Sequence, residues 1–172
     1  RTGAPTFGTP EYAKAALISG QLARRYRLPY RSSGIATGNA PDAQSTCESM
    51  MSAWSAITGG VNILHHAAGW LEGGLTASFE KLVIDVEALQ MFASFLNPER
   101  VDAETLAVDT IEEVGPGGHF FAAPHTLARY ETAFYTPLLS DWRNYETWRE
   151  DGARDATVRA HDIAMQAIAE HE

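Results

Sequence analysis

The order of the expected secondary-structure elements constrains the fold of this chain more than any other feature. Hydrophobic spacing and helix-capping residues predict a helix, a strand, a helix, a strand and a helix in turn, over residues 9–27, 30–33, 42–58, 61–66 and 79–96. Alternation of this kind is typical of parallel strands joined by helical crossovers.

Only helices are expected in the remainder of the chain. One should begin at the capping residue Asp102 and end at Gly115, with Val101 and Leu106 as a hydrophobic staple. Shorter helices are expected over residues 126–131, 145–150 and 156–171. Two strands cannot bury both faces of a parallel sheet, so either the expected number of strands is wrong or the chain is a piece of a larger α/β fold, and we favour the second interpretation. In an α/β barrel the functional groups lie in the loops that follow the strands.

Composition and charge exclude several functional classes. The content of 45% hydrophobic and 20% charged residues in 172 residues is that of a soluble globular domain. The formal net charge of −9 argues against a nucleic-acid partner, and the absence of an 18-residue apolar run argues against a membrane span. Cys47 is the only cysteine, so no internal disulfide can form, and residues 1–8 show no apolar signal-peptide core. A cytoplasmic location is therefore expected.

Several segments, in the right order, resemble one known family. The first is Asn39-Ala40-Pro41-Asp42-Ala43-Gln44, and the second runs from His66-Ala67-Ala68-Gly69-Trp70-Leu71-Glu72-Gly73-Gly74-Leu75 into residues 79–85. Residues 113–121, Pro124-His125-Thr126, Tyr135, residues 141–145 and Trp148 continue the match. Together they resemble the trimethylamine methyltransferase family, and several segments of about ten residues are a stronger signal than one short motif.

The resemblance implies a fold and an activity. Residues 1–172 would be the C-terminal part of a methyltransferase barrel domain, that is, the helix-rich C-terminal portion of a (β/α)8 TIM-type barrel with few parallel strands. Such an enzyme moves a methyl group from a small methylated amine to the cobalt of a corrinoid (cobalamin) carried by a separate protein, with no cofactor held tightly by this chain. Founding members contain pyrrolysine. Because this sequence has only the standard twenty residues, it is similar to the non-pyrrolysine, glycine betaine methyltransferase-like branch, which suits quaternary amines. The alternative is a truncated, inactive module that binds an amine or a partner.

The loops after the two strands carry the substrate-binding candidates, which are Trp70, Glu72, His65, His66, Asn39 and Asp42. Aromatic faces hold quaternary ammonium groups and a carboxylate adds attraction. Strand alternation directs one of the two histidines inward, where it could bond a substrate carboxylate. The structural alternatives stay open: a tryptophan packed under its loop, a glutamate capping a turn, backbone-bonded histidines, an Asn that caps a helix, and an Asp in the first helical turn that complements the helix dipole.

A third cluster, Gly117, Gly118, His119 and His125, is the candidate for corrinoid access, because its glycines permit close approach. The alternative is a helix stop followed by a packed Phe120-Phe121 pair. No convincing nucleophile–base pair is present, so no catalytic side chain is assigned. No His or Cys spacing fits a metal site, so none is expected. Unpaired strand edges favour a homo-oligomer.

Overall fold

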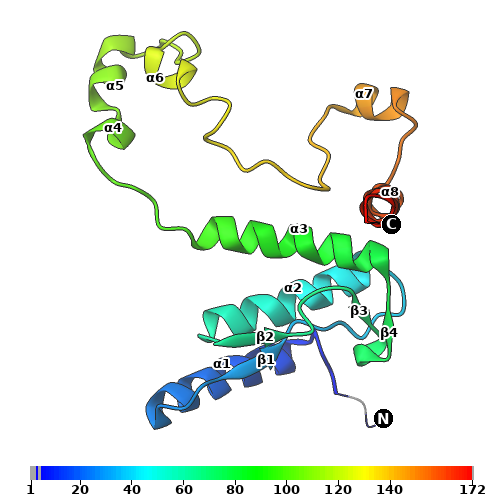
Figure 1. Ribbon diagram of the computed structural model, residues 1–172. Coiled ribbons are helices and arrows are strands. Elements are labelled where there is room, and N and C mark those ends of the chain that lie inside the picture. The colour runs from blue at the N-terminus through cyan, green and yellow to red at the C-terminus, as the bar shows by residue number, and fades with distance from the viewer. Residues whose placement is uncertain (1–2, 4, 172) are drawn as a thin grey trace. The chain divides into compact units, whose positions relative to one another are not determined.

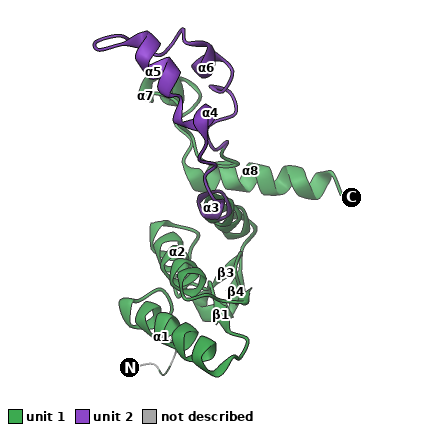
Figure 2. Ribbon diagram, turned by 90° about the vertical axis from the view of Figure 1, so that its left-hand side faces the viewer, with its two compact units in different colours: residues 1–92, 137–172 green, residues 93–136 purple. Residues whose placement is uncertain are grey.

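The computed structural model describes residue 3 and residues 5–171, and the chain divides into two compact units, Arg1–Phe92 with Pro137–Glu172, and Ala93–Thr136 (Figure 2). The first unit contains most of the predicted alternation. Its elements are α1 (Pro10–Tyr26), β1 (Arg31–Ser33), α2 (Ala43–Thr58), β2 (Ile63–His65), β3 (Trp70–Leu71), a 3₁₀ turn (Glu72–Gly74), β4 (Thr76–Ala77), most of α3 (Phe79–Leu96), α7 (Tyr145–Glu150) and α8 (Ala156–Ala169). The three long helices predicted before residue 97 are confirmed, as are the tail helices predicted over residues 145–150 and 156–171, whereas the helix predicted over residues 126–131 is replaced by a single turn of helix at Pro124–Leu127.

Helices α1 and α2 lie side by side because small residues line their contact (Figure 1). Ala13, Ala16 and Gly20 are buried on α1, and a Cβ atom on Gly20 would lie 2.0 Å from the Gly59 carbonyl oxygen. The Arg24 guanidinium at the end of α1 donates to the same carbonyl. Both helices begin at a capping side chain, Thr9 for α1 and Asp42 for α2. Close packing at Gly20 fixes the two helices against each other.

Strands β1 and β2 pair in parallel, with Arg31 opposite Ile63 and Ser33 opposite His65. Because partners across a ladder and alternate residues along a strand share a face, these four side chains lie on one face of the pair. Arg31 and His65 are exposed, and Ile63 is 57% exposed. The expectation that two parallel strands leave a face unburied is confirmed.

Two local predictions were wrong. The segment predicted as a glycine-rich loop after β2 forms a small antiparallel hairpin of β3 and β4, with Trp70 opposite Ala77. Strands of two residues are too short to show a hydrophobic period. The helix predicted from Asp102 to Gly115 is broken at Ala107, whose φ of 51° is left-handed, into α4 (Ala103–Leu106) and α5 (Val108–Val114). Val101 and Leu106 are 76% and 56% exposed, so the predicted staple buries neither side chain.

The C-terminal segment returns to α3. Val83 and Ile84 of α3 form a core cluster with Leu139 and with Ala160 and Ala164 of α8. The buried Glu87 carboxylate accepts hydrogen bonds from the backbone N–H groups of residues 138 and 139 at 2.7 and 3.0 Å. The second unit holds the last part of α3, then α4, α5 and α6 (Pro124–Leu127). No helix among the described residues is both long and apolar enough to span a membrane.

Candidate functional site

The two histidines stand at the carboxyl end of β2, where the sequence places them. The Arg31 guanidinium lies 3.2 Å from His65 Nδ1, and because arginine only donates, this nitrogen accepts and the ring proton is on Nε2. His66 Nδ1 lies 3.2 Å from Ser33 Oγ, and its ring meets that of His65 edge to face at 5.7 Å. His65 continues the exposed strand face, whereas His66 has left the strand, with a φ of 48°.

Trp70 completes an aromatic row with the histidines. Its indole ring meets the His66 ring at 5.6 Å and 88°, and it is 37% exposed. An edge-to-face arrangement of this kind stabilises both rings by about 0.5–1.5 kcal/mol. A side chain held by a neighbouring ring and still open to solvent is suited to receive a ligand. We call His65, His66 and Trp70 the aromatic row.

Two cavities flank the aromatic row. His66 lines one of 460 Å³ together with Tyr12, Arg31 and Ser33. Trp70 lines another of 460 Å³ that also contains Phe79, Ser78 and Glu80. The first cavity therefore offers hydroxyl groups and a cation, and the second offers two aromatic faces and a carboxylate.

The loops after β1 and β2 are tied to one another by backbone bonds. The N–H groups of Glu72 and Gly73 donate to the carbonyl oxygens of Gly38 and Ala36, both at 2.9 Å. Glu48 of α2 holds the first loop, because its Oε2 accepts from the Thr37 N–H at 2.7 Å, the Thr37 hydroxyl at 2.8 Å and the Gly38 N–H at 2.9 Å. Burial raises the pKa of Glu48, but hydrogen bonds from Gln44, Thr37 and Gly38 outweigh that effect and leave the pKa below its usual value.

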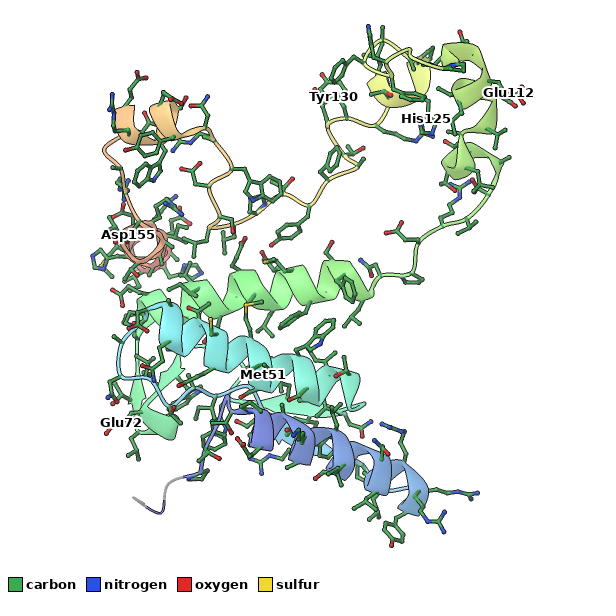
Figure 3. The ribbon with its side chains drawn as sticks, turned by 180° about the vertical axis from the view of Figure 1, so that it is seen from behind. Met51, Glu72, Glu112, His125, Tyr130 and Asp155 are labelled. Carbon is green, nitrogen blue, oxygen red and sulfur yellow. The ribbon has the colours of Figure 1, made fainter. Side chains whose placement is uncertain are left out.

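The remaining substrate-binding candidates do not join the aromatic row. Glu72 lies in the turn of the hairpin (Figure 3), accepts from the Thr76 hydroxyl at 3.0 Å, and lines a different cavity of 620 Å³ with Thr37. Asp42 caps α2 by accepting from the Ser45 N–H at 3.2 Å, so its structural role is the one observed. Asn39 is exposed in the first loop.

Two of the five described non-glycine residues with a positive φ lie in this region. His66 and Glu72 adopt φ values of 48° and 50°, in the left-handed region that residues other than glycine seldom occupy. Such conformations cost of order 1–3 kcal/mol and cluster at ligand sites. Both strained residues follow directly on β2 and β3.

The corrinoid-access candidates all lie in the second unit. Gly117 and Gly118 follow α5, and Gly117 has a φ of 78°. His119 is exposed and packs beside Phe121 at 5.7 Å, and His125 bonds to the Glu104 carbonyl at 2.9 Å (Figure 3). Phe120 and Phe121 are 45% and 82% exposed, so they do not form the packed pair of the structural alternative. Across the described residues, no three His, Cys, Asp or Glu side chains are grouped as metal ligands would be.

Comparison with known proteins decides the family. The family model described as trimethylamine methyltransferase matches residues 1–172. The chain belongs to the trimethylamine methyltransferase family. It is 38% identical, over 99% of its length, to a glycine betaine methyltransferase of Desulfitobacterium hafniense, and 33% identical, also over 99%, to trimethylamine methyltransferase MttB1 of Methanosarcina acetivorans. These alignments cover 36% and 34% of the two relatives, so the chain spans about a third of their length.

Sequence reasoning missed several residues of this family member that surround the aromatic row. Arg31 and Ser33 bond the two histidines from β1, and Phe79 and Glu80 share the cavity of Trp70. Their positions could have been anticipated only from the register of the two strands and from the hairpin. The strand register brings together residues that are far apart in the sequence, and the hairpin turns the chain back sharply.

Proposed function

We propose that this chain is the C-terminal part of a (β/α)8 barrel enzyme that transfers a methyl group from a methylated amine, preferably a quaternary one, to the cobalt of a corrinoid carried by a separate protein. The observation that carries the proposal is the aromatic row, which begins at the carboxyl end of the parallel strand β2 and continues into the hairpin that follows it, in a member of the trimethylamine methyltransferase family. The carboxyl ends of barrel strands are where such enzymes bind their ligands.

The open face of the β1–β2 pair supports the barrel. The side chains of Arg31, Ile63 and His65 are exposed on this face. A completed barrel would bury them in its interior. We propose that strands outside these 172 residues cover that face, so the catalytic site is whole only in the longer protein. A truncated module that binds amines without turnover is the second candidate, and the relatives' threefold greater length favours the enzyme.

The aromatic row suits a quaternary ammonium ion that also carries a carboxylate. The indole face of Trp70 would hold the methylated nitrogen through a cation–π contact, worth roughly 0.5–2 kcal/mol. His66, with Arg31 in the same cavity, would bond the carboxylate. Glycine betaine has both groups, and the relative of 38% identity carries that substrate in its name.

The methyl transfer requires no nucleophilic or basic side chain from the protein. The corrinoid's reduced cobalt supplies the electron pair that bonds the methyl carbon, while the C–N bond breaks and the amine leaves with that bond's electrons. The protein's share is to bind the amine, orient one methyl group and exclude water. A quaternary nitrogen leaves as a neutral amine and needs no proton, which fits a site without a nucleophile–base pair.

The second unit is the proposed route for the corrinoid. Gly117 and Gly118 leave the backbone free of side chains, and the neighbouring His119 is exposed. Truncating His119 and His125 to alanine should weaken binding of the corrinoid protein without changing amine binding. We also propose self-association of the protein, which light scattering would show as a mass above that of one chain.

A binding panel on the full-length protein tests the substrate assignment. Glycine betaine and tetramethylammonium should bind more tightly than trimethylamine, because only they carry a fixed cation without an N–H proton. Equal affinity for trimethylamine would overturn the quaternary preference and leave the family assignment intact. Absence of binding by all three would overturn the amine site.

A further inference from the structure

A buried ion pair lies directly behind the hairpin that carries Trp70. Lys81 and Asp85, one turn apart on α3, are 0% and 4% exposed. The Lys81 ammonium donates to one oxygen of Asp85 and, at 2.8 Å, to the hydroxyl of Ser49 on α2. Both charges are therefore removed from water inside the first unit.

The second oxygen of Asp85 holds the residue before Trp70. It accepts from the Gly69 N–H at 2.9 Å, and the Gly69 carbonyl accepts from the Ser78 N–H at 3.0 Å. Gly69 has a φ of 84°, and a Cβ atom there would lie 3.3 Å from Leu82 Cβ. Gly69, which leads into β3, is thus fixed at its N–H, at its carbonyl and by packing.

Stability alone is a poor explanation for this arrangement. Burying two charges costs several kcal/mol of desolvation per ion, and apolar pairs of similar volume are often as stable or more so. An apolar pair would, however, remove the acceptor for Gly69. The Asp85 carboxylate supplies an acceptor that fixes the direction of the Gly69 N–H bond.

We infer that Asp85 is a positioning residue for Trp70: its side-chain oxygen fixes the Gly69 N–H so that the indole meets His66, and Lys81 offsets the charge of the buried carboxylate. The inference rests on the proposed amine site. The geometry links α2, α3 and the hairpin through Ser49, Lys81 and Asp85, so the aromatic row is set by the helices behind it.

Two double variants of the full-length protein distinguish the effect of the acceptor for Gly69 from the effect of the two buried charges. Lys81→Met with Asp85→Asn removes both charges but keeps an amide oxygen for Gly69. Lys81→Met with Asp85→Leu removes the charges and the acceptor. Glu87→Gln is the control for general destabilisation, because Glu87 is an equally buried carboxylate on α3 (5% exposed) that holds residues 138 and 139 instead.

The readouts are the affinity for tetramethylammonium, the urea midpoint, and hydrogen exchange of the peptide spanning residues 66–72. We expect the Leu variant to bind about tenfold more weakly and to exchange faster at 66–72, while the Asn variant and Glu87→Gln bind like the wild type. Equal affinity, or an equal loss, in the two double variants overturns the inference. If the wild type binds no ammonium ion, the proposed function fails, and the exchange readout still decides whether Asp85 fixes the hairpin.

Discussion

Replacing Trp70 with alanine should weaken binding of a quaternary ammonium ion about tenfold in the full-length protein. The indole is 37% exposed and is held edge to face by His66 at 5.6 Å, so the substitution removes an aromatic face that is already oriented. A cation on such a face gains roughly 0.5–2 kcal/mol. Since about 1.4 kcal/mol is a factor of ten in Kd, the expected loss is about tenfold.

Trp54 provides a matched control, because it is also 37% exposed but packs against Phe92 at 5.5 Å. Isothermal titration with tetramethylammonium should give a Kd about tenfold higher for Trp70→Ala, within about threefold of wild type for Trp70→Phe, and unchanged for Trp54→Ala. Docking of the corrinoid protein should be the same in all of them. An unchanged Kd in Trp70→Ala, or an equal loss in both alanine variants, would refute the reasoning.

Three further results are expected. Hydrogen bonds from Ser78 and His161 lower the pKa of Glu80 from 4.5 to about 2. The ionised Glu80 therefore stabilises the fold above pH 4.5, and this contribution is lost as the pH falls toward 2. Glu80→Gln should remove this acid dependence from the free energy of unfolding in urea, and an unaltered pH profile would contradict the prediction. Ala107→Gly should stabilise the break between α4 and α5 or leave it unchanged, because φ is 51° there, and a lower melting temperature would count against that backbone. No stoichiometric metal should accompany the purified protein; one zinc per chain by elemental analysis, for instance through Cys47, would show a site that the sequence does not predict.

Local signals in the sequence predicted the parts of the fold that depend on neighbouring residues. Thr9 and Asp102 cap helices as expected, because an N-cap is a contact over three residues, whereas Asp42, expected in the first turn of α2, is itself the N-cap. The alternation of strands and helices predicted the parallel pairing of β1 and β2. The same alternation predicted that His65 and His66 lie at the end of a strand.

Long-range contacts could not be predicted in this way. The bond from Gly69 to Asp85 joins residues sixteen positions apart, and it exists only because the hairpin folds back against α3. The same hairpin turns Glu72 toward Thr37 rather than into the cavity of Trp70, although the two residues are neighbours in sequence. Such directions depend on backbone turns that composition and spacing do not encode.

Methyl transfer by the full-length protein is the most direct test of the central claim. Glycine betaine and the reduced corrinoid protein would be mixed with it, and the visible absorbance of the corrinoid followed over time. We expect the spectrum to change to that of the methylated corrinoid in the presence of the wild-type protein, and more slowly with Trp70→Ala at an amine concentration below the Kd. An unchanged corrinoid spectrum with glycine betaine, tetramethylammonium and trimethylamine alike would contradict the proposed function.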